Sequence, residues 1–412
     1  MSSDRAKPRI GLALAGGGPL GAIYEIGALC ALDEALTGID LRQLDGYVGV
    51  SAGGFIAAGL ANGFSPRDLC SVFIESEDAD DEDLFSPSLL MRPAWGEYLK
   101  RAASLPRLTA HAALEYFFSA RRSRLAAFER LARALPPGLF SGKAMERRLA
   151  RLFAKEGRTN DFRELDRKLV LVATDLDTGE AVPFGQPGLD DVPISVAVQA
   201  SAALPGLYAP VEVHGRTCVD GALKKTLHAT VLLDEGLDLL ICLNPLVPFD
   251  ATRAPHHKVL GSGEARIPKL VDGGLPVVLS QTFRSLIHSR LELGLRGYEQ
   301  SHPHSDIVLF EPDHRDAELY MANTFSVSQR RVLAEHAYQR TREMLRSRRS
   351  TLGAQLARHG VGIDRAVLDD MDRRLIGRIK PRRGGTRTAR ALKRLEETLS
   401  DLEQQQAGAA AR

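Results

Sequence analysis

The stretch from Leu12 to Leu32 reads LALAGGGPLGAIYEIGALCAL. The run RIGLAL at 9–14, which overlaps its start, is apolar, ends in glycines and is typical of a strand buried on both faces of a sheet. The residues after the glycines place apolar side chains at helical spacing as far as Gly38. A strand, a glycine turn and a helix in this order predict the start of an α/β sheet.

The glycines of this turn permit two functions. Gly16, Gly18 and Gly21 satisfy the G-x-G-x-x-G spacing of dinucleotide-binding loops. Dinucleotide-binding folds also have an acidic residue at the end of the next strand, which binds the ribose. Asp40 and Asp45 stand before the next apolar strand rather than after it. The order disfavours a ribose site, and the loop can equally offer its backbone N–H groups to a transient anion.

The second motif is GYVGVSAGG at 46–54, where Gly49, Ser51 and Gly53 form G-x-S-x-G. It lies between an expected strand at 45–50 and an expected helix of small residues. A serine on such a sharp strand-to-helix turn is exposed as a nucleophile, and the helix N-terminus favours negative charge beside it. The alternative is that Ser51 only caps the helix.

A serine nucleophile needs a base. Asp220 stands at the end of an expected strand, in the glycine-containing turn of CVDGAL. Functional residues of open α/β sheets collect at that end of the strands, although an Asp-Gly pair can also be a plain turn.

Further elements follow along the chain. The pattern changes at 84–140, which predicts an inserted helical segment that is not part of a sheet. Strands are expected at 168–176, 180–184, 215–223, 238–245 and, as the last one, 306–312; helices at 65–77, 194–205, 276–299 and 328–346; and polar helices joined by a linker beyond 350.

Four motifs together resemble the patatin-like phospholipase family. They are GGGPLG at 16–21, GVSAGG at 49–54, ASAALPGLYAPV at 200–211 and VDGAL at 219–223, in the order and rough spacing of that family. The resemblance implies a three-layer α/β/α fold, to which this chain adds an inserted helical cap and a helical C-terminal extension. It covers about half of the chain.

The resemblance also implies a catalytic centre. Ser51 is expected to be the nucleophile, Asp220 the general base, and the loop of Gly16, Gly17 and Gly18 the oxyanion hole. Such a Ser-Asp dyad uses no histidine, no cofactor and no metal, and a triad that recruits one of the eleven histidines is the rival within this class.

Two positions in these motifs depart from the family. Leu20 stands where the family usually has Arg or Lys, and Ala222 replaces the commoner second glycine of the turn.

We expect three parts along the chain: a tail at 1–8, a catalytic domain at 9–346 with its insertion at 84–140, and a polar basic extension at 347–412. The stretch before the first glycines has about six apolar residues, too few for a signal peptide or a membrane span, so the expected location is the cytoplasm. The four cysteines are scattered in apolar runs and are expected to be reduced core residues.

Charge is arranged in blocks, although the formal net charge is only +2. Residues 75–83 hold seven acids, and residues 376–394 hold eight Lys/Arg and no acid. The segment 98–135 mixes arginines with aromatic residues and leucines. It can lie on an anionic membrane or cover an acyl pocket, or it can pack its apolar stripe on the core.

The sequence as a whole predicts a lipid acyl hydrolase that acts on carboxylic esters, most plausibly of phospholipids or lysophospholipids. The expected partners are the lipid or another acyl ester and, through the basic segments, a membrane surface; no nucleic acid is expected. Two other classes stay open: a non-catalytic or nucleotide-binding α/β module that uses the glycine loop, and an interaction protein that acts through the basic tail.

Overall fold

The computed structural model describes residues 7–75, 86–118, 134–252, 269–320 and 327–377. The chain divides into two units, residues 1–375 and 376–412. Nearly all of the described residues belong to the first unit. The basic run at 378–394, most of the acidic run at 75–83 and the linker beyond 378 lie outside the described residues.

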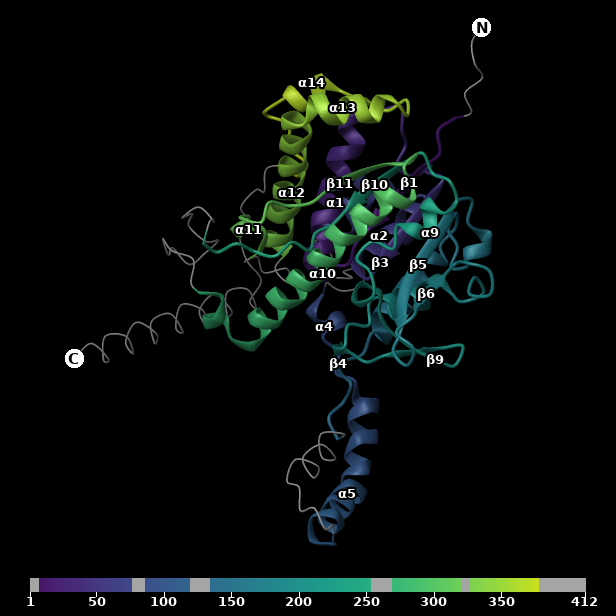
Figure 1. The fold of residues 1–412 in the computed structure, drawn as a ribbon, viewed down its shortest axis with the longest axis vertical. Helices are drawn as coiled ribbons and strands as arrows, with labels where there is room; N and C mark the ends of the chain where they lie inside the picture. The colour runs from purple at the N-terminus through teal and green to yellow at the C-terminus, as the bar shows by residue number, and fades with distance from the viewer. Residues whose placement is uncertain (1–6, 76–85, 119–133, 253–268, 321–326, 378–412) are drawn as a thin grey trace, which may run out of the picture. The chain divides into compact units, whose positions relative to one another are not determined.

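An eight-stranded mixed sheet forms the centre of the first unit (Figure 1). Its strands follow the order β11-β10-β1-β3-β5-β9-β8, and β6 also pairs with β5. The five strands from β11 to β5 run parallel, whereas β6, β8 and β9 join antiparallel. This confirms the predicted α/β sheet. The strands are β1 (Ile10–Leu14), β3 (Gly46–Val50), β5 (Lys168–Asp175), β6 (Ala181–Phe184), β8 (Val211–Val213), β9 (Arg216–Asp220), β10 (Leu239–Leu243) and β11 (Asp306–Phe310).

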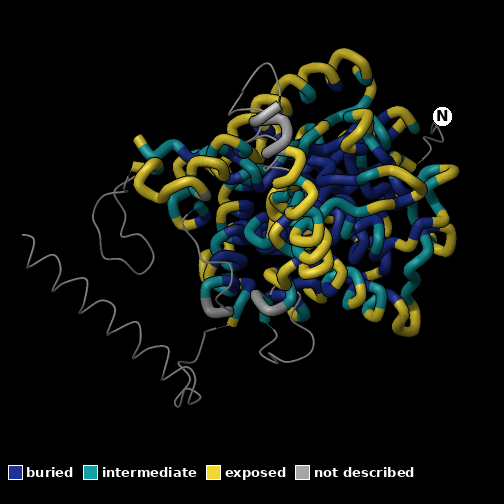
Figure 2. Tube along the Cα trace, turned by 90° about the horizontal axis from the view of Figure 1, so that it is seen from below, coloured by how far each residue is buried: buried dark blue, intermediate teal, exposed yellow. Residues whose placement is uncertain are grey.

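Helices cover both faces of this sheet and produce three layers. On one face, alternate side chains of the central strands pack with α9 (Thr230–Leu233) and α10 (Gly274–Ser301). On the other face, α1 (Gly18–Ala35), α2 (Ala52–Ala61) and α8 (Ile194–Ser201) pack together, and α12 (Val327–Ser347) lies against α1. In Figure 2 the buried residues, drawn in dark blue, accordingly gather in the interior of the fold.

The first helix is buried along most of its length, because it is enclosed between the sheet and α12. A Cβ atom at Gly27 would lie 2.4 Å from the backbone oxygen of Ala334, so the two helices touch backbone to backbone at that point. A helix with apolar residues on every side is stable only in such a buried position. This packing fixes the glycine loop at its N-terminus relative to the sheet.

The elements after the second strand differ in part from the prediction. The helix expected at 65–77 begins as α3 (Pro66–Cys70), whose N-cap Ser65 forms a capping box with Asp68, and continues as the π-helix η1 (Ser71–Glu75). The expected helix 194–205 ends at Ser201. Beyond 350, α13 (Arg349–Ala357) and α14 (Arg365–Asp369) are helices as expected.

The prediction that β11 is the last strand is wrong. β12 (Gly362–Ile363) pairs antiparallel with β2 (Leu36–Thr37), directly after α1. Two residues are too short a segment to show a strand pattern in the sequence.

The prediction of a purely helical insertion at 84–140 is wrong at its end. The segment contains α4 (Pro87–Leu90) and α5 (Trp95–Phe118), but β4 (Gly138–Phe140) pairs in parallel with β7 (Gly206–Tyr208). A Cβ atom at Gly138 would lie 2.1 Å from the carbonyl carbon of Tyr208, so only glycine allows this pairing. The strand is three residues long and has no alternation that the sequence could reveal.

The alternative in which the insertion packs an apolar stripe on the core is not supported for the described part of α5. Every side chain of this helix whose burial is described, from Trp95 to His111, is exposed or only partly buried. Residues 119–133 lie outside the described residues.

Two further expectations concern membranes and cysteines. Within the described ranges, no helix is both long enough and apolar enough to cross a membrane. Cys30, Cys70, Cys218 and Cys242 are free and buried, as expected.

Candidate active site

Ser51 lies at the turn from β3 into α2, in a strained backbone conformation. Its φ is 52° and its ψ is −121°, a region that a residue with a side chain rarely adopts. The neighbouring glycines make the turn possible. A Cβ atom at Gly49 would lie 2.5 Å from the Cα atom of Gly54, and one at Gly53 would lie 2.4 Å from the backbone oxygen of Ala15. The G-x-S-x-G pattern is therefore a packing requirement of this turn.

The Ser51 side chain does not cap α2, so the capping alternative is wrong. The backbone N–H of Ser51 instead donates to Ser201 Oγ at 2.8 Å, and Ser201 Oγ donates to the backbone oxygen of Val172 at 2.6 Å. Ser201 is fully buried at the end of α8 and connects the Ser51 turn to β5. Ser201 lies in the ASAALPGLYAPV motif, but the motif alone does not indicate this role.

Asp220 ends β9 opposite Ala173 of β5 and is 4% exposed. Its carboxylate accepts the backbone N–H of Ala222 at 2.9 Å. A Cβ atom at Gly16 would lie 3.0 Å from Ser51 Cβ and 3.5 Å from Ala222 Cβ, so the Ser51 turn and the Asp220 turn meet at this glycine. Burial raises the pKa of Asp220 to about 6, and the Ala222 N–H and the Ser51 side chain, which both lower the pKa, only partly oppose this effect. The structure thus brings together Ser51 and Asp220, which are far apart in the sequence.

His228 is the histidine that packs beside the Asp220 turn in the described part of the chain. Its Nε2 donates to the backbone oxygen of Gly221 at 3.2 Å, and burial lowers its pKa to about 4, so the ring is neutral at pH 7. Among the described residues, the groups that shift the pKa of Asp220 include no histidine. The triad is not supported there, and His256 and His257 lie outside the described residues.

The glycine loop lies directly beside Ser51. A Cβ atom at Gly16 would lie 3.0 Å from Ser51 Cβ and 3.6 Å from its Oγ, so this position accepts no side chain without displacing the serine. Gly17 is the N-cap of α1, where no side chain caps the helix, and Gly18 follows with a φ of 59°. The first N–H groups of a helix have no acceptor within it, so those after the loop can bind an anion.

The two aspartates considered for ribose binding lie elsewhere. Asp45 precedes β3, and its carboxylate accepts the backbone N–H of Ile10 at the start of β1. Asp40 pairs with Arg42 at 2.9 Å. Both lie at the amino ends of the strands, whereas the glycine loop lies at the carboxyl ends. Neither Asp40 nor Asp45 can therefore bind the ribose of a nucleotide held at the glycine loop.

The arrangement joins a strained serine, a buried carboxylate with a raised pKa and a helix N-terminus. These three parts can transfer an acyl group: the serine attacks, the carboxylate takes the proton, and N–H groups stabilise the oxyanion.

The chain is similar to a known protein family and to several solved structures. The family model described as "Patatin-like phospholipase" matches residues 12–233, which include both Ser51 and Asp220. VipD from Legionella pneumophila has 16% identity and a TM-score of 0.37, over 83% of this chain and 67% of that chain. The type III effector ExoU of Pseudomonas aeruginosa has 17% identity and a TM-score of 0.34, over 83% and 53%.

A human structure is also similar. Human GIVD cytosolic phospholipase A2, in complex with methyl gamma-linolenyl fluorophosphonate, has 12% identity and a TM-score of 0.31, over 84% of this chain and 60% of that chain. The chain thus spans between about half and two thirds of the length of these solved chains.

The burial of Asp220 has a consequence for stability. The folded-state pKa of about 6 is higher than the pKa of about 3.9 in an unfolded chain, so folding becomes less favourable as the pH rises from 4 to 6. We expect Asp220→Asn to be more stable than the wild type by about 1–3 kcal/mol at pH 8 and equal to it below pH 4. Urea denaturation at both pH values measures this.

A matched control variant should show the opposite change in stability at pH 8. Arg163 lowers the pKa of Asp161 to about 2, so Asp161→Asn should lose stability at pH 8. If Asp220→Asn is also less stable at pH 8, the carboxylate is not buried as described.

Proposed function

The chain belongs to the patatin-like phospholipase family, and on this premise we propose that it is a serine acyl hydrolase that cleaves carboxylic esters of lipids. The observation that carries the proposal is the position of the Ser51 side chain, which lies beside the glycine loop and close enough to the buried Asp220 carboxylate to lower its pKa. No cofactor is needed for the chemistry of these groups.

In the first step, Ser51 Oγ attacks the carbonyl carbon of the ester, and Asp220 accepts the hydroxyl proton. The carbonyl oxygen becomes an oxyanion, which the N–H groups of the Gly16–Gly18 loop stabilise; each such donor contributes about 3–4 kcal/mol to the transition state. Asp220 then returns the proton to the leaving alcohol. An acyl group remains on Ser51.

In the second step, water attacks the acyl-Ser51 carbonyl, and Asp220 accepts a proton from that water. As the second tetrahedral intermediate collapses, Asp220 passes this proton to Ser51 Oγ, which releases the carboxylic acid and restores the serine hydroxyl. A pKa of about 6 leaves Asp220 mostly ionised at pH 7 and makes it a stronger base than an exposed aspartate. The strained turn holds the hydroxyl in place throughout.

Replacing the nucleophile tests the proposal. We expect the wild type to hydrolyse a short-chain p-nitrophenyl ester and Ser51→Ala to lose at least about 1,000-fold in kcat, because no other group can form the acyl intermediate. Release of p-nitrophenolate measures this, with the exposed Ser347→Ala as the matched control that keeps full activity.

Two outcomes would contradict the proposal. One is hydrolysis that survives in Ser51→Ala. The other is the absence of hydrolysis in the wild type together with saturable binding of NAD or ATP, which would favour the nucleotide-binding module.

The pH dependence of hydrolysis identifies the base. Because Asp220 must be ionised to accept the proton, kcat/KM should rise tenfold per pH unit below pH 6 and level off above an apparent pKa of about 6. Initial rates from pH 4 to 9 measure this. Asp220→Asn should abolish activity, whereas His228→Gln should keep the same profile; a profile that disappears in His228→Gln would point to the histidine triad.

We further propose that α5 contacts a lipid surface. Trp95 is 67% exposed and Leu99 is 69% exposed, and Lys100 and Arg107 add exposed positive charge on the same helix. Exposed apolar side chains next to basic ones bind anionic membranes through burial and electrostatic attraction together.

Vesicle binding tests this contact. We expect the protein to sediment with vesicles that contain phosphatidylserine, and the double variant Trp95→Ser/Leu99→Ser to bind about tenfold more weakly, since two large apolar side chains no longer leave water. Leu293→Ser on α10, which is 62% exposed in the wild type, is the control. Equal binding by all three proteins would refute a role for α5.

A further inference from the structure

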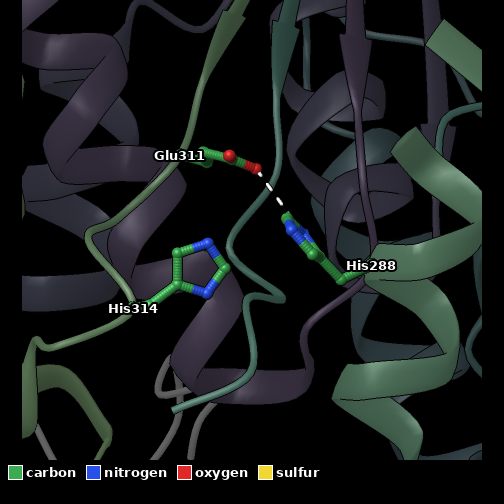
Figure 3. A group of neighbouring side chains, drawn as sticks. All are labelled: His288, Glu311 and His314. Carbon is green, nitrogen blue, oxygen red and sulfur yellow. Dashed lines mark ion pairs between the residues drawn. The ribbon is translucent and has the colours of Figure 1, made fainter. Parts of the chain in front are cut away.

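Three side chains outside the candidate active site meet at the carboxyl edge of the sheet. Glu311 directly follows β11, His314 lies in the loop after it, and His288 belongs to α10. One ligand atom from each lies within 4.8 Å of the others. Figure 3 shows Glu311 and His314 on the segment after β11, with His288 opposite them on α10. The sequence did not suggest this group, because its members share no local spacing motif.

His288 has a buried nitrogen with no hydrogen-bond partner. The residue is 8% exposed, and its Nδ1 lies 3.8 Å from Glu311 Oε2, too far for a hydrogen bond. Buried polar atoms almost always have partners, so an orphan that points at a carboxylate requires an explanation. A bound ion between the two groups would supply the missing partner.

The surrounding contacts of His288 and His314 leave one ring nitrogen of each histidine available to bind such an ion. His288 Nε2 lies 3.4 Å from Glu292 Oε1, and a ring proton on Nε2 would face this carboxylate and leave Nδ1 free to act as a ligand. His314 Nδ1 donates to the backbone oxygen of Pro248 at 3.0 Å, which leaves Nε2 as a ligand. Metal-binding histidines commonly donate their other N–H to a carboxylate or a backbone carbonyl in this way.

Glu311 is held in a comparable manner. Its Oε2 accepts a hydrogen bond from the Asn244 side chain at 3.2 Å, and Asn244 follows β10, the strand next to β11. The carboxylate is thus oriented by a fully buried amide. His314 and Glu311 are therefore each oriented by a hydrogen bond, and the Glu292 carboxylate lies beside His288 Nε2.

We propose that His288 Nδ1, Glu311 and His314 Nε2 bind a divalent transition-metal ion, for which Zn²⁺ is the best fit. Two imidazoles and a carboxylate with a fourth position for water are a common Zn²⁺ ligand set. In a tetrahedral site, bonds of about 2.0–2.1 Å place two ligand atoms roughly 3.3 Å apart, so ligand atoms that are now within 4.8 Å of one another must approach by up to about 1.5 Å when the ion binds. A hard cation such as Mg²⁺ prefers oxygen ligands.

The position in the sheet indicates what the ion would hold. β11 is three strands from β3, which places the group about 14 Å from the Ser51 turn. The site is thus separate from the candidate dyad. The site joins α10 to the loop after β11. Asn244, which orients Glu311, is followed by Pro245, and Pro245 packs against Gly17 and Gly21 at the start of α1. The ion would tie together segments that support that loop.

Metal titration of the full chain tests the proposal without any use of hydrolysis. The protein, freed of affinity tags and dialysed against EDTA, is titrated with Co²⁺ by absorption spectroscopy and with Zn²⁺ against a chromogenic chelator. We expect one equivalent to bind, with the Co²⁺ bands of a four-coordinate site, and the melting temperature to rise with Zn²⁺ concentration.

Variants locate the ion. His288→Gln and His314→Gln should each lose stoichiometric binding, and Glu292→Gln, which removes only the outer partner of His288, should bind about 10-fold to 100-fold more weakly. His302→Gln, whose ring contacts Asp234 away from this group, should bind as the wild type does. His314→Gln changes a half-buried loop residue, and circular dichroism verifies that each variant is folded.

Two results would overturn the proposal. One is the absence of stoichiometric binding to the folded wild type. The other is unchanged binding in the folded His288→Gln and His314→Gln variants, which would place the ion elsewhere and leave His288 and Glu311 as an ordinary ion pair.

Discussion

The burial of one carboxyl group is the constraint on which the candidate site depends. Asp220 lies among the strands and helices of the core, where water cannot stabilise its charge, and its pKa rises to about 6 as a result. The groups that lower this pKa are the Ala222 backbone N–H, which hydrogen-bonds with the carboxylate, and the Ser51 side chain. The fold thus exchanges stability at neutral pH for a base that we propose to act on the serine, a trade typical of active sites.

Much of the fold could be predicted from the sequence, because the central strands and helices carry strong local patterns. The apolar runs that became β1, β3, β5 and β10 are continuous, and the small residues around Ser51 reflect a turn in which backbone atoms touch. β4 and β12 could not be predicted. Each is very short, and each forms only because a distant segment, β7 or β2, lies beside it.

The candidate site was predictable where motifs carry it and not where tertiary contacts do. Ser51 and Asp220 could be proposed from their turns and from the family resemblance. The role of Ser201, which holds the Ser51 backbone, depends on how α8 meets β5 and has no signature in the sequence. The His288 group is even harder to predict from the sequence, since α10 brings His288 to the loop that follows β11. Ser51, after β3, and the His288 group, after β11, both lie at the carboxyl edge of the parallel strands of this sheet. Functional residues of α/β sheets collect at that edge.

Reaction with an alkyl fluorophosphonate, followed by peptide mass spectrometry, tests the central claim most directly, because a serine displaces the fluoride rapidly only when it is activated. The account predicts one phosphonyl group per chain, located on Ser51. It also predicts that the modification slows as the pH falls below 6 and is absent in Asp220→Asn. A modified residue other than Ser51, or modification of Ser51 that is unaffected by the loss of Asp220, would contradict the account.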